Sequence, residues 1–138
     1  MRAVLDTVVF VRALINPRGR WGRLLFELSD RYVIVLSPEI IKEILEVLYR
    51  SSLRQKFPQI DEVSVDQVLA VIENAEVVES DAELSVCRDA SDNKFFEAAL
   101  AGAAEYIVSE DRDILDITEY SGIKTIAAYE FLKLISSL

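Results

Sequence analysis

Short apolar runs alternate with helical patterns along almost the whole chain, and this alternation limits the folds that the chain can adopt. Residues 3–11 and 32–36 are nearly continuously apolar and rich in β-branched side chains, as expected for strands buried on both faces. Strands separated by helices of this size form a parallel sheet with right-handed crossovers and helices on both faces. The chain is therefore predicted to be an α/β protein with a central parallel β-sheet.

The rest of the chain continues this alternation. A helix running to about residue 49 has a clear start, because Ser37 suits the N-cap, Pro38 the first helical position and Glu39 the first turn. Further helices are predicted at 21–29, 64–74, 92–104 and 129–136, strands at 76–79, 106–108 and 124–127, and a short helical turn between 113 and 120. No repeat or linker interrupts the 138 residues, so a single domain over residues 1–138 is expected.

The composition excludes several kinds of catalytic site. The chain has no histidine and a single cysteine, Cys87, so Ser-His-Asp and Cys-His catalysis, histidine-ligated zinc, thiolate zinc clusters and internal disulfides are all ruled out. Carboxylates and a metal ion remain as the obvious tools of an enzyme. No apolar run is long enough to span a bilayer, and the first residues lack the layout of a signal peptide, so a cytoplasmic location is expected.

The net charge of −9 is unfavourable for an enzyme that acts on nucleic acid, because phosphates attract a basic surface. A metal ion bound among the acids would offset part of this repulsion, and the same negative field could attract a basic protein partner. Basic residues do cluster locally in two places, at Arg18, Arg20 and Arg23 and at Arg50, Arg54 and Lys56.

Acidic side chains recur where the predicted strands end or the predicted helices begin. Asp6 interrupts the first apolar run, Asp92 opens a helix, and Asp111 and Asp113 follow the strand at 106–108. The carboxyl ends of parallel strands share one edge of a sheet, so these acids are expected to lie together there. Glu43 is added to the set from a helix, and only the family resemblance described below distinguishes it from Glu39 and Glu46. Mg²⁺ and Mn²⁺ prefer oxygen ligands, and such an ion can activate water for attack on a phosphodiester.

Each acid also has an ordinary structural explanation. Burying Asp6 unpaired would cost roughly several kcal/mol, but it could instead accept backbone N–H groups from the following loop. Glu43 shares a helical stripe with Glu39 and Glu46, so it could be a solvated side chain on an outward face. For single acids these explanations carry weight.

The later acids have similar alternatives. Asp92 could serve only the first turn of its helix, and Asp113 could cap the turn that follows it. The ordered set of acids is more specific than any one of its members. It is the set that supports a functional site.

The order and setting of these acids resemble those of the PIN-domain ribonucleases, in particular the VapC-like toxins of toxin–antitoxin pairs. The resemblance covers nearly the whole chain. The most specific motifs are Asp92-Asn93-Lys94-Phe95 and the acids before Ile114-Leu115, with an alanine-rich helix between them; the motif around Asp6-Thr7 and the helix that carries Glu43 are weaker matches.

The resemblance implies a PIN sandwich and an Mg²⁺- or Mn²⁺-dependent endoribonuclease. It also implies a homodimer and an antitoxin that covers the acidic pocket. In the site so implied, Asp6, Asp92 and Asp111 hold metal, Glu43 and Asp113 assist through water, and Thr7 and Ser109 orient the carboxylates.

One residue departs from the family pattern and keeps a second function open. Val8 stands where such proteins usually carry an Asn that braces the acids, so the chain could be a weakened PIN fold that acts through protein partners. A phosphoacceptor receiver domain is a third possibility. It would need a phosphate-contacting Lys after its last strand, whereas Lys124 precedes the strand predicted there.

Overall fold

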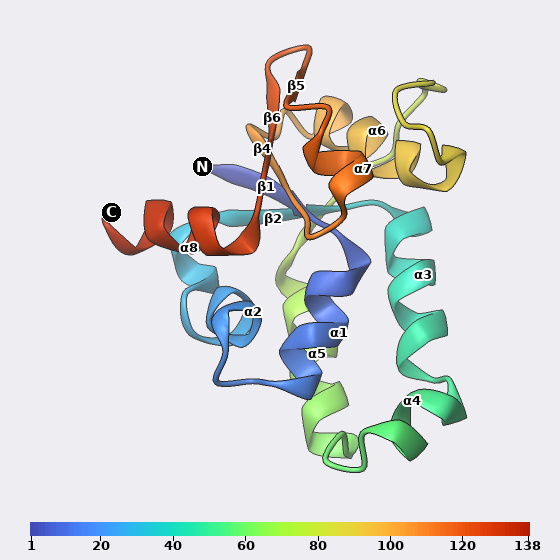
Figure 1. Cartoon of the computed structure of the whole chain (residues 1–138), viewed down its shortest axis with the longest axis vertical. Coiled ribbons are helices and arrows are strands. Elements are labelled where there is room, and N and C mark those ends of the chain that lie inside the picture. The colour runs from blue at the N-terminus through green and yellow to red at the C-terminus, as the bar shows by residue number, and fades with distance from the viewer.

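The computed structural model describes all 138 residues and contains an α/β fold (Figure 1). The strands are β1 (Arg2–Leu5), β2 (Val33–Leu36), β3 (Glu76–Val77), β4 (Tyr106–Val108), β5 (Glu119–Tyr120) and β6 (Ile123–Ile126). The α-helices are α1 (Thr7–Ile15), α2 (Arg20–Gly22), α3 (Pro38–Leu48), α4 (Ser51–Lys56), α5 (Glu62–Asn74), α6 (Asn93–Ala101), α7 (Arg112–Leu115) and α8 (Ala128–Ser136). A π-helix, η1 (Arg23–Glu27), and two 3₁₀ turns, η2 (Ser29–Arg31) and η3 (Ala90–Asp92), complete the list.

The six strands form one sheet in the order β3-β2-β1-β4-β6-β5. All neighbours pair in parallel except β5 and β6, which pair antiparallel at the edge. The predicted central parallel sheet is thus confirmed, with one antiparallel strand added. After β1 the chain builds outward through β2 and β3, then returns to place β4 on the other side of β1. The strand order reverses there, and a crevice is expected beyond the carboxyl ends of β1 and β4.

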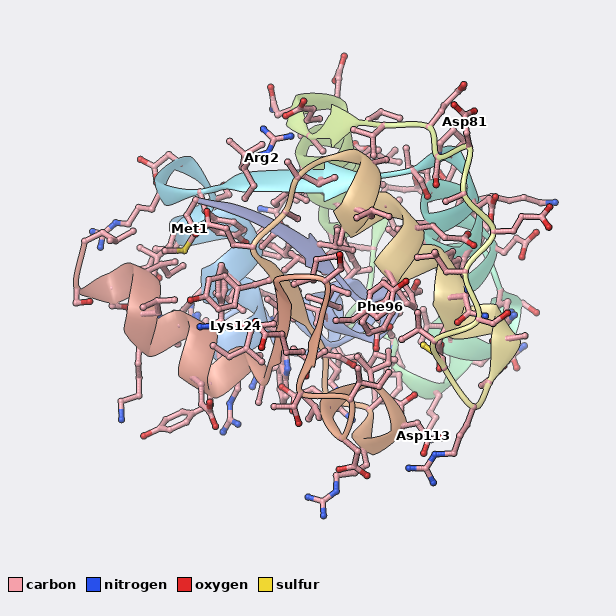
Figure 2. All side chains as sticks on the ribbon, turned by 90° about the horizontal axis from the view of Figure 1, so that it is seen from above. Met1, Arg2, Asp81, Phe96, Asp113 and Lys124 are labelled. Atoms are coloured by element: carbon pink, nitrogen blue, oxygen red, sulfur yellow. The ribbon has the colours of Figure 1, made fainter.

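Helices cover both faces of the sheet and enclose the core. In Figure 1, α6 lies on one face, and α1 and α5 lie on the other. Figure 2 shows Phe96 of α6 pointing into the interior, where it is fully buried together with Phe10 of α1 and Phe131 of α8. These large aromatic side chains account for much of the apolar surface that holds the layers together. The longest helix has 13 residues, and none is long and apolar enough to cross a membrane.

Several boundaries differ from the sequence-based expectation. The strand predicted for residues 3–11 ends at Leu5, and residues 7–15 form α1. A buried strand and a buried helix are equally apolar, so the pattern alone could not separate them. Helix α4 and strand β5 were not predicted, because both are short and largely exposed. The segment expected as one helix at 21–29 is divided among α2, η1 and the start of η2.

The turn into α2 depends on a close backbone approach. A Cβ at Gly22 would lie 1.8 Å from the carbonyl oxygen of Pro17. Backbone cannot yield as a flexible side chain can, so only glycine fits between the loop at 16–19 and α2. Gly22 thereby fixes how this loop presents the arginines on either side of it.

Gly22→Ala should lower the free energy of unfolding by about 2 kcal/mol, the usual cost of forcing an extra carbon into a packed site. Gly19→Ala is the matched control, because its Cβ would first meet the movable side-chain amide of Asn16 and its φ of −79° suits alanine. Urea unfolding of the three proteins measures the difference. Equal urea midpoints for the two variants would contradict this prediction, because the contact of the added Cβ with Pro17 would then cost no extra stability.

Candidate functional site

Asp6 lies at the junction of β1 and α1 and is only 5% exposed. Its Oδ1 accepts a hydrogen bond from the backbone N–H of Val8 at 3.2 Å, which caps α1. Its Oδ2 accepts a hydrogen bond from the hydroxyl of Ser109 at 2.7 Å. Asp6 is therefore both a helix cap and a carboxylate held at the edge of the sheet. Asp6 thus has the capping role that the sequence offered as its ordinary explanation, and the same carboxylate can also belong to a functional site.

Ser109 joins the ends of the two central strands. It follows β4 directly and is completely buried. While its hydroxyl donates to Asp6, the same oxygen accepts the backbone N–H of Asp111 at 2.9 Å. Asp111 in turn caps α7, because its Oδ1 accepts the N–H of Asp113 at 2.9 Å. The cap of this turn is thus Asp111 and not Asp113, contrary to the alternative considered from the sequence.

Glu43 is the half-buried member of its helical stripe, whereas Glu39 and Glu46 are exposed. The hydroxyl of Thr7 donates a hydrogen bond to Glu43 Oε1. The Nζ of Lys94 lies 2.6 Å from Glu43 Oε2, and the lysine side chain is only 11% exposed. Helix α3 therefore turns this one glutamate inward, and Thr7 orients Glu43.

The carboxylate of Asp92 accepts no hydrogen bond from another residue, although the backbone N–H donates to the carbonyl oxygen of Asp89 at 3.0 Å. It precedes α6 but makes no side-chain cap there, and the nearby 3₁₀ turn is capped by Asp89 instead. The next residue faces away from it: the side-chain oxygen of Asn93 accepts the backbone N–H groups of Val86 and Cys87. Asn93 thereby ties the irregular segment before α6 to the helix, and the carboxylate of Asp92 is left free.

Burial and mutual repulsion weaken the acidity of this cluster. Desolvation raises the pKa of Asp6 above its ordinary value, and the charges of Asp111 and Glu43 add to the effect. Desolvation also raises the pKa of Asp92 to about 6, with further contributions from Asp111, Asp89 and Asp6. The charges of these acids therefore act on one another.

Cys87 lies beside the same cluster, half-buried and free. Burial raises the pKa of its thiol to about 11, and the charges of Asp92 and Asp111 add to the effect. Cys87 is thus a protonated thiol near neutral pH, which makes it a poor nucleophile and a poor metal ligand.

Four of the five predicted acids face one another, and one lies apart. Asp6, Glu43, Asp92 and Asp111 interact through their charges. The carboxylate of Asp113 lies 3.8 Å from the guanidinium of Arg88 instead. Figure 2 shows Asp113 at the outer side of α7. Asp113 therefore belongs to the rim of the cluster.

The donor chemistry of the cluster fits a hard divalent cation. All the side-chain atoms that it offers to a cation are carboxylate oxygens, and an ion would relieve the repulsion that adds to desolvation in raising the pKa of Asp6 and of Asp92. As they stand, no three acidic or cysteine side chains lie close enough together to hold an ion. Mg²⁺ needs only one or two direct carboxylates and keeps several waters, so pairs of these acids suffice for it.

The structure adds residues that sequence analysis had not assigned to the cluster. Lys94 pairs with Glu43, Arg88 with Asp113, and Glu110 accepts a hydrogen bond from the indole N–H of Trp21 at 3.2 Å. Lys94 was signalled only by its place next to Asp92-Asn93. Nothing in the local pattern indicated the other two, because both contacts join elements that are far apart in the sequence.

Asp92→Asn should stabilise the metal-free protein above pH 7. The folded-state pKa of Asp92 is raised above that of an unfolded aspartate, so its favourable contribution is complete below about pH 4 and is lost as the pH rises through about 6. The full shift corresponds to about 3 kcal/mol. The side chain is half-exposed, so about 1 kcal/mol is expected after solvent screening.

Urea unfolding in chelator across this pH range measures the effect. Asp66→Asn on α5 is the control, because its exposed carboxylate lies outside the cluster. An advantage for Asp92→Asn that stayed constant from pH 4 to pH 8 would contradict the assigned titration.

Comparison with known proteins places this geometry in a family. The family model of the PIN domain matches residues 2–113. The uncharacterized protein MJ1680 of Methanocaldococcus jannaschii is 31% identical over 121 residues, which cover 86% of this chain and 76% of that protein.

Solved structures share the fold at low sequence identity. The crystal structure of PAE2754 from Pyrobaculum aerophilum matches with a TM-score of 0.63 and 14% identity over the whole of both chains. The crystal structure of VapBC2 from Rickettsia felis, bound to a DNA fragment from the VapBC2 promoter, contains a second match. The TM-score is 0.60 and the identity 14%, over 92% of this chain and 98% of that one. With the PIN-domain model matched over residues 2–113, the chain belongs to the PIN-domain family.

Proposed function

We propose that this chain is a metal-dependent endoribonuclease acting as a single domain over residues 1–138. The observation that supports the proposal best is the carboxylate of Asp92, which has no hydrogen-bonding partner and interacts with the charges of Asp6 and Asp111. A protein gains nothing in stability from a free acid placed beside two others. Such an arrangement is typical of a site that is completed by a cation.

In the proposed site Asp6, Asp92 and Asp111 would hold Mg²⁺ or Mn²⁺, one or two of them directly and the rest through water on the ion. The ion would lower the pKa of a water and neutralise charge on the phosphodiester. Ser109 keeps Asp6 and Asp111 in place through its two hydrogen bonds. Thr7 and Lys94 orient Glu43, which together with Asp113 at the rim assists through water.

The proposed biological role is that of the toxin in a toxin–antitoxin pair, working as a homodimer. The VapBC2 structure belongs to such a pair, and its fold is shared here. The net charge of −9 suits an antitoxin that presents a basic segment to the acids. RNA is proposed as the substrate because the family resemblance points to ribonucleases.

Asp6→Asn and Asp92→Asn should each lower the cleavage of single-stranded RNA about 100-fold or more, since each removes a charge that the cation needs. Both variants should remain folded. Asparagine at position 6 keeps the oxygen that accepts the N–H of Val8, and its amide can donate to the hydroxyl oxygen of Ser109 with that bond reversed, while the carboxylate of Asp92 makes no hydrogen bond. Calorimetric titration with Mn²⁺ should show binding to the wild type that is lost with Asp92→Asn and kept with Asp66→Asn. Cleavage by either site variant at the wild-type rate would exclude the four-acid site.

A second candidate function rests on Val8. Its backbone N–H donates a hydrogen bond to the capping carboxylate of Asp6, but its side chain has no polar atom that could brace the acids, and it is 39% exposed. A PIN fold weakened in this way would act through protein partners rather than by cutting RNA. The acidic surface is equally compatible with that role.

Val8→Asn separates the two candidates. If the chain is an enzyme, the wild type binds Mn²⁺ measurably, and the variant should change the dissociation constant by less than about tenfold. A weakened interaction module predicts almost no binding by the wild type and a sharp gain in the variant. Val63→Asn controls for an added amide, since Val63 is an exposed valine on α5.

A further inference from the structure

The first helices carry positive charge that the rest of the chain does not share. Between residues 7 and 26 there are four arginines and no acid, in a chain of net charge −9. Four cations of this region and of α8, namely Arg12, Arg18, Arg20 and Lys133, are exposed and form no salt bridge. This is a local reversal of the overall charge.

Aromatic rings alternate with these cations. The guanidinium of Arg20 lies 5.3 Å from the ring centre of Trp21 and 5.6 Å from that of Tyr129. The guanidinium of Arg12 lies 5.2 Å from the ring centre of Trp21, and the Nζ of Lys133 lies 5.2 Å from that of Tyr129. The resulting sequence of groups is cation, ring, cation, ring, cation, and we call it the basic-aromatic surface.

Three elements build the basic-aromatic surface. Helix α2 packs against both α1 and α8, as Figure 1 shows. The loop before α2 is fixed by the contact between Gly22 and Pro17 described above. Tyr129 is 53% exposed, and together with Lys133 it lines an open hollow of about 420 Å³. The surface is thus preformed and open to solvent.

The basic-aromatic surface adjoins the acidic cluster. The indole N–H of Trp21 donates to Glu110, the residue immediately before Asp111. On α1, Arg12 lies one helical turn beyond Val8, whose N–H is bound by Asp6. The surface therefore begins where the acids end.

We propose that the basic-aromatic surface binds a single strand of RNA and leads it to the acidic cluster. The identity of the polymer rests on the proposed function. Phosphates would contact the unpaired cations, and bases would stack on Tyr129 and on the exposed part of Trp21, which is how proteins hold single strands without reading their sequence. An acidic protein segment could use the cations, but it has no use for rings placed between them.

The second basic cluster of the chain lacks these features. On α4, Arg54 is paired with Glu62 at 3.0 Å, and only Arg50 and Lys56 remain unpaired. One ring, Phe57, accompanies Lys56. Arg50 and Lys56 therefore provide a control that removes the same charge from another exposed place.

Fluorescence anisotropy in chelator tests the proposal, with a labelled, unstructured RNA and salt varied between about 50 and 200 mM. Arg12→Ala/Arg20→Ala should bind at least tenfold more weakly than the wild type. The slope of log affinity against log salt should fall by about 1.4, since each phosphate contact to a single strand contributes about 0.7. Arg50→Ala/Lys56→Ala should stay within twofold of the wild type.

Tyr129→Ala tests stacking separately. It should weaken binding about fivefold or more and leave the salt slope unchanged, because a base is lost and no charge is removed. Equal losses in the two double variants, no binding by the wild type, or displacement of the RNA by polyglutamate at equal charge concentration would each overturn the proposal.

The assay contains no metal and needs no cleavage, so its readout does not depend on nuclease activity. RNA binding that depends on Arg12 and Arg20, without cleavage when metal is added later, would support the proposed RNA-binding surface and contradict the proposed nuclease. RNA cleavage that is unaffected in Arg12→Ala/Arg20→Ala would support the proposed nuclease and contradict the proposed RNA-binding surface.

Discussion

The carboxylate of Asp6 holds together the part of the molecule where the two central strands diverge. One oxygen caps α1 through Val8, and the other accepts the hydroxyl of Ser109 at the end of β4. Because both bonds satisfy a group that is costly to bury, the ends of β1 and β4 and the start of α1 have fixed positions relative to one another. Asp111 is positioned against this frame through Ser109, and Glu43 through Thr7.

The frame also explains why the cluster carries unrelieved repulsion. Ser109 brings Asp111 close to Asp6, and Asn93 directs its own side chain to the preceding segment, which leaves Asp92 beside them. Lys94 offsets part of this charge, but its closest carboxylate is that of Glu43. The repulsion is thus concentrated among Asp6, Asp92 and Asp111, none of which forms a salt bridge. Stability alone would favour a neutral residue at position 92, which makes a functional demand the better explanation.

Local sequence signals predicted those elements whose own residues carry a clear start signal or a short apolar run. Ser37-Pro38-Glu39 marked the start of α3, and the apolar run at 106–108 marked β4. The pattern failed at residues 7–11, because the run is apolar even at the exposed Val8 and so has no polar period by which a helix could be told from a strand. The contacts of Lys94 with Glu43 and of Trp21 with Glu110 join distant elements. They follow from the strand order, which one sequence does not reveal.

Net charge describes the whole chain and does not locate a surface where nucleic acid could bind. Charges in water are screened beyond about 8 Å at physiological ionic strength, so the acids of α5 and of the segment at 79–83 act weakly on a distant face. What a phosphate meets at the basic-aromatic surface is set by Arg12, Arg20 and Lys133, which have no salt-bridge partners. An RNA strand held there would approach the acids only where a bound cation offsets their negative charge. The overall negative charge and the local positive surface are therefore compatible, because a bound strand interacts mainly with the charges that lie close to it.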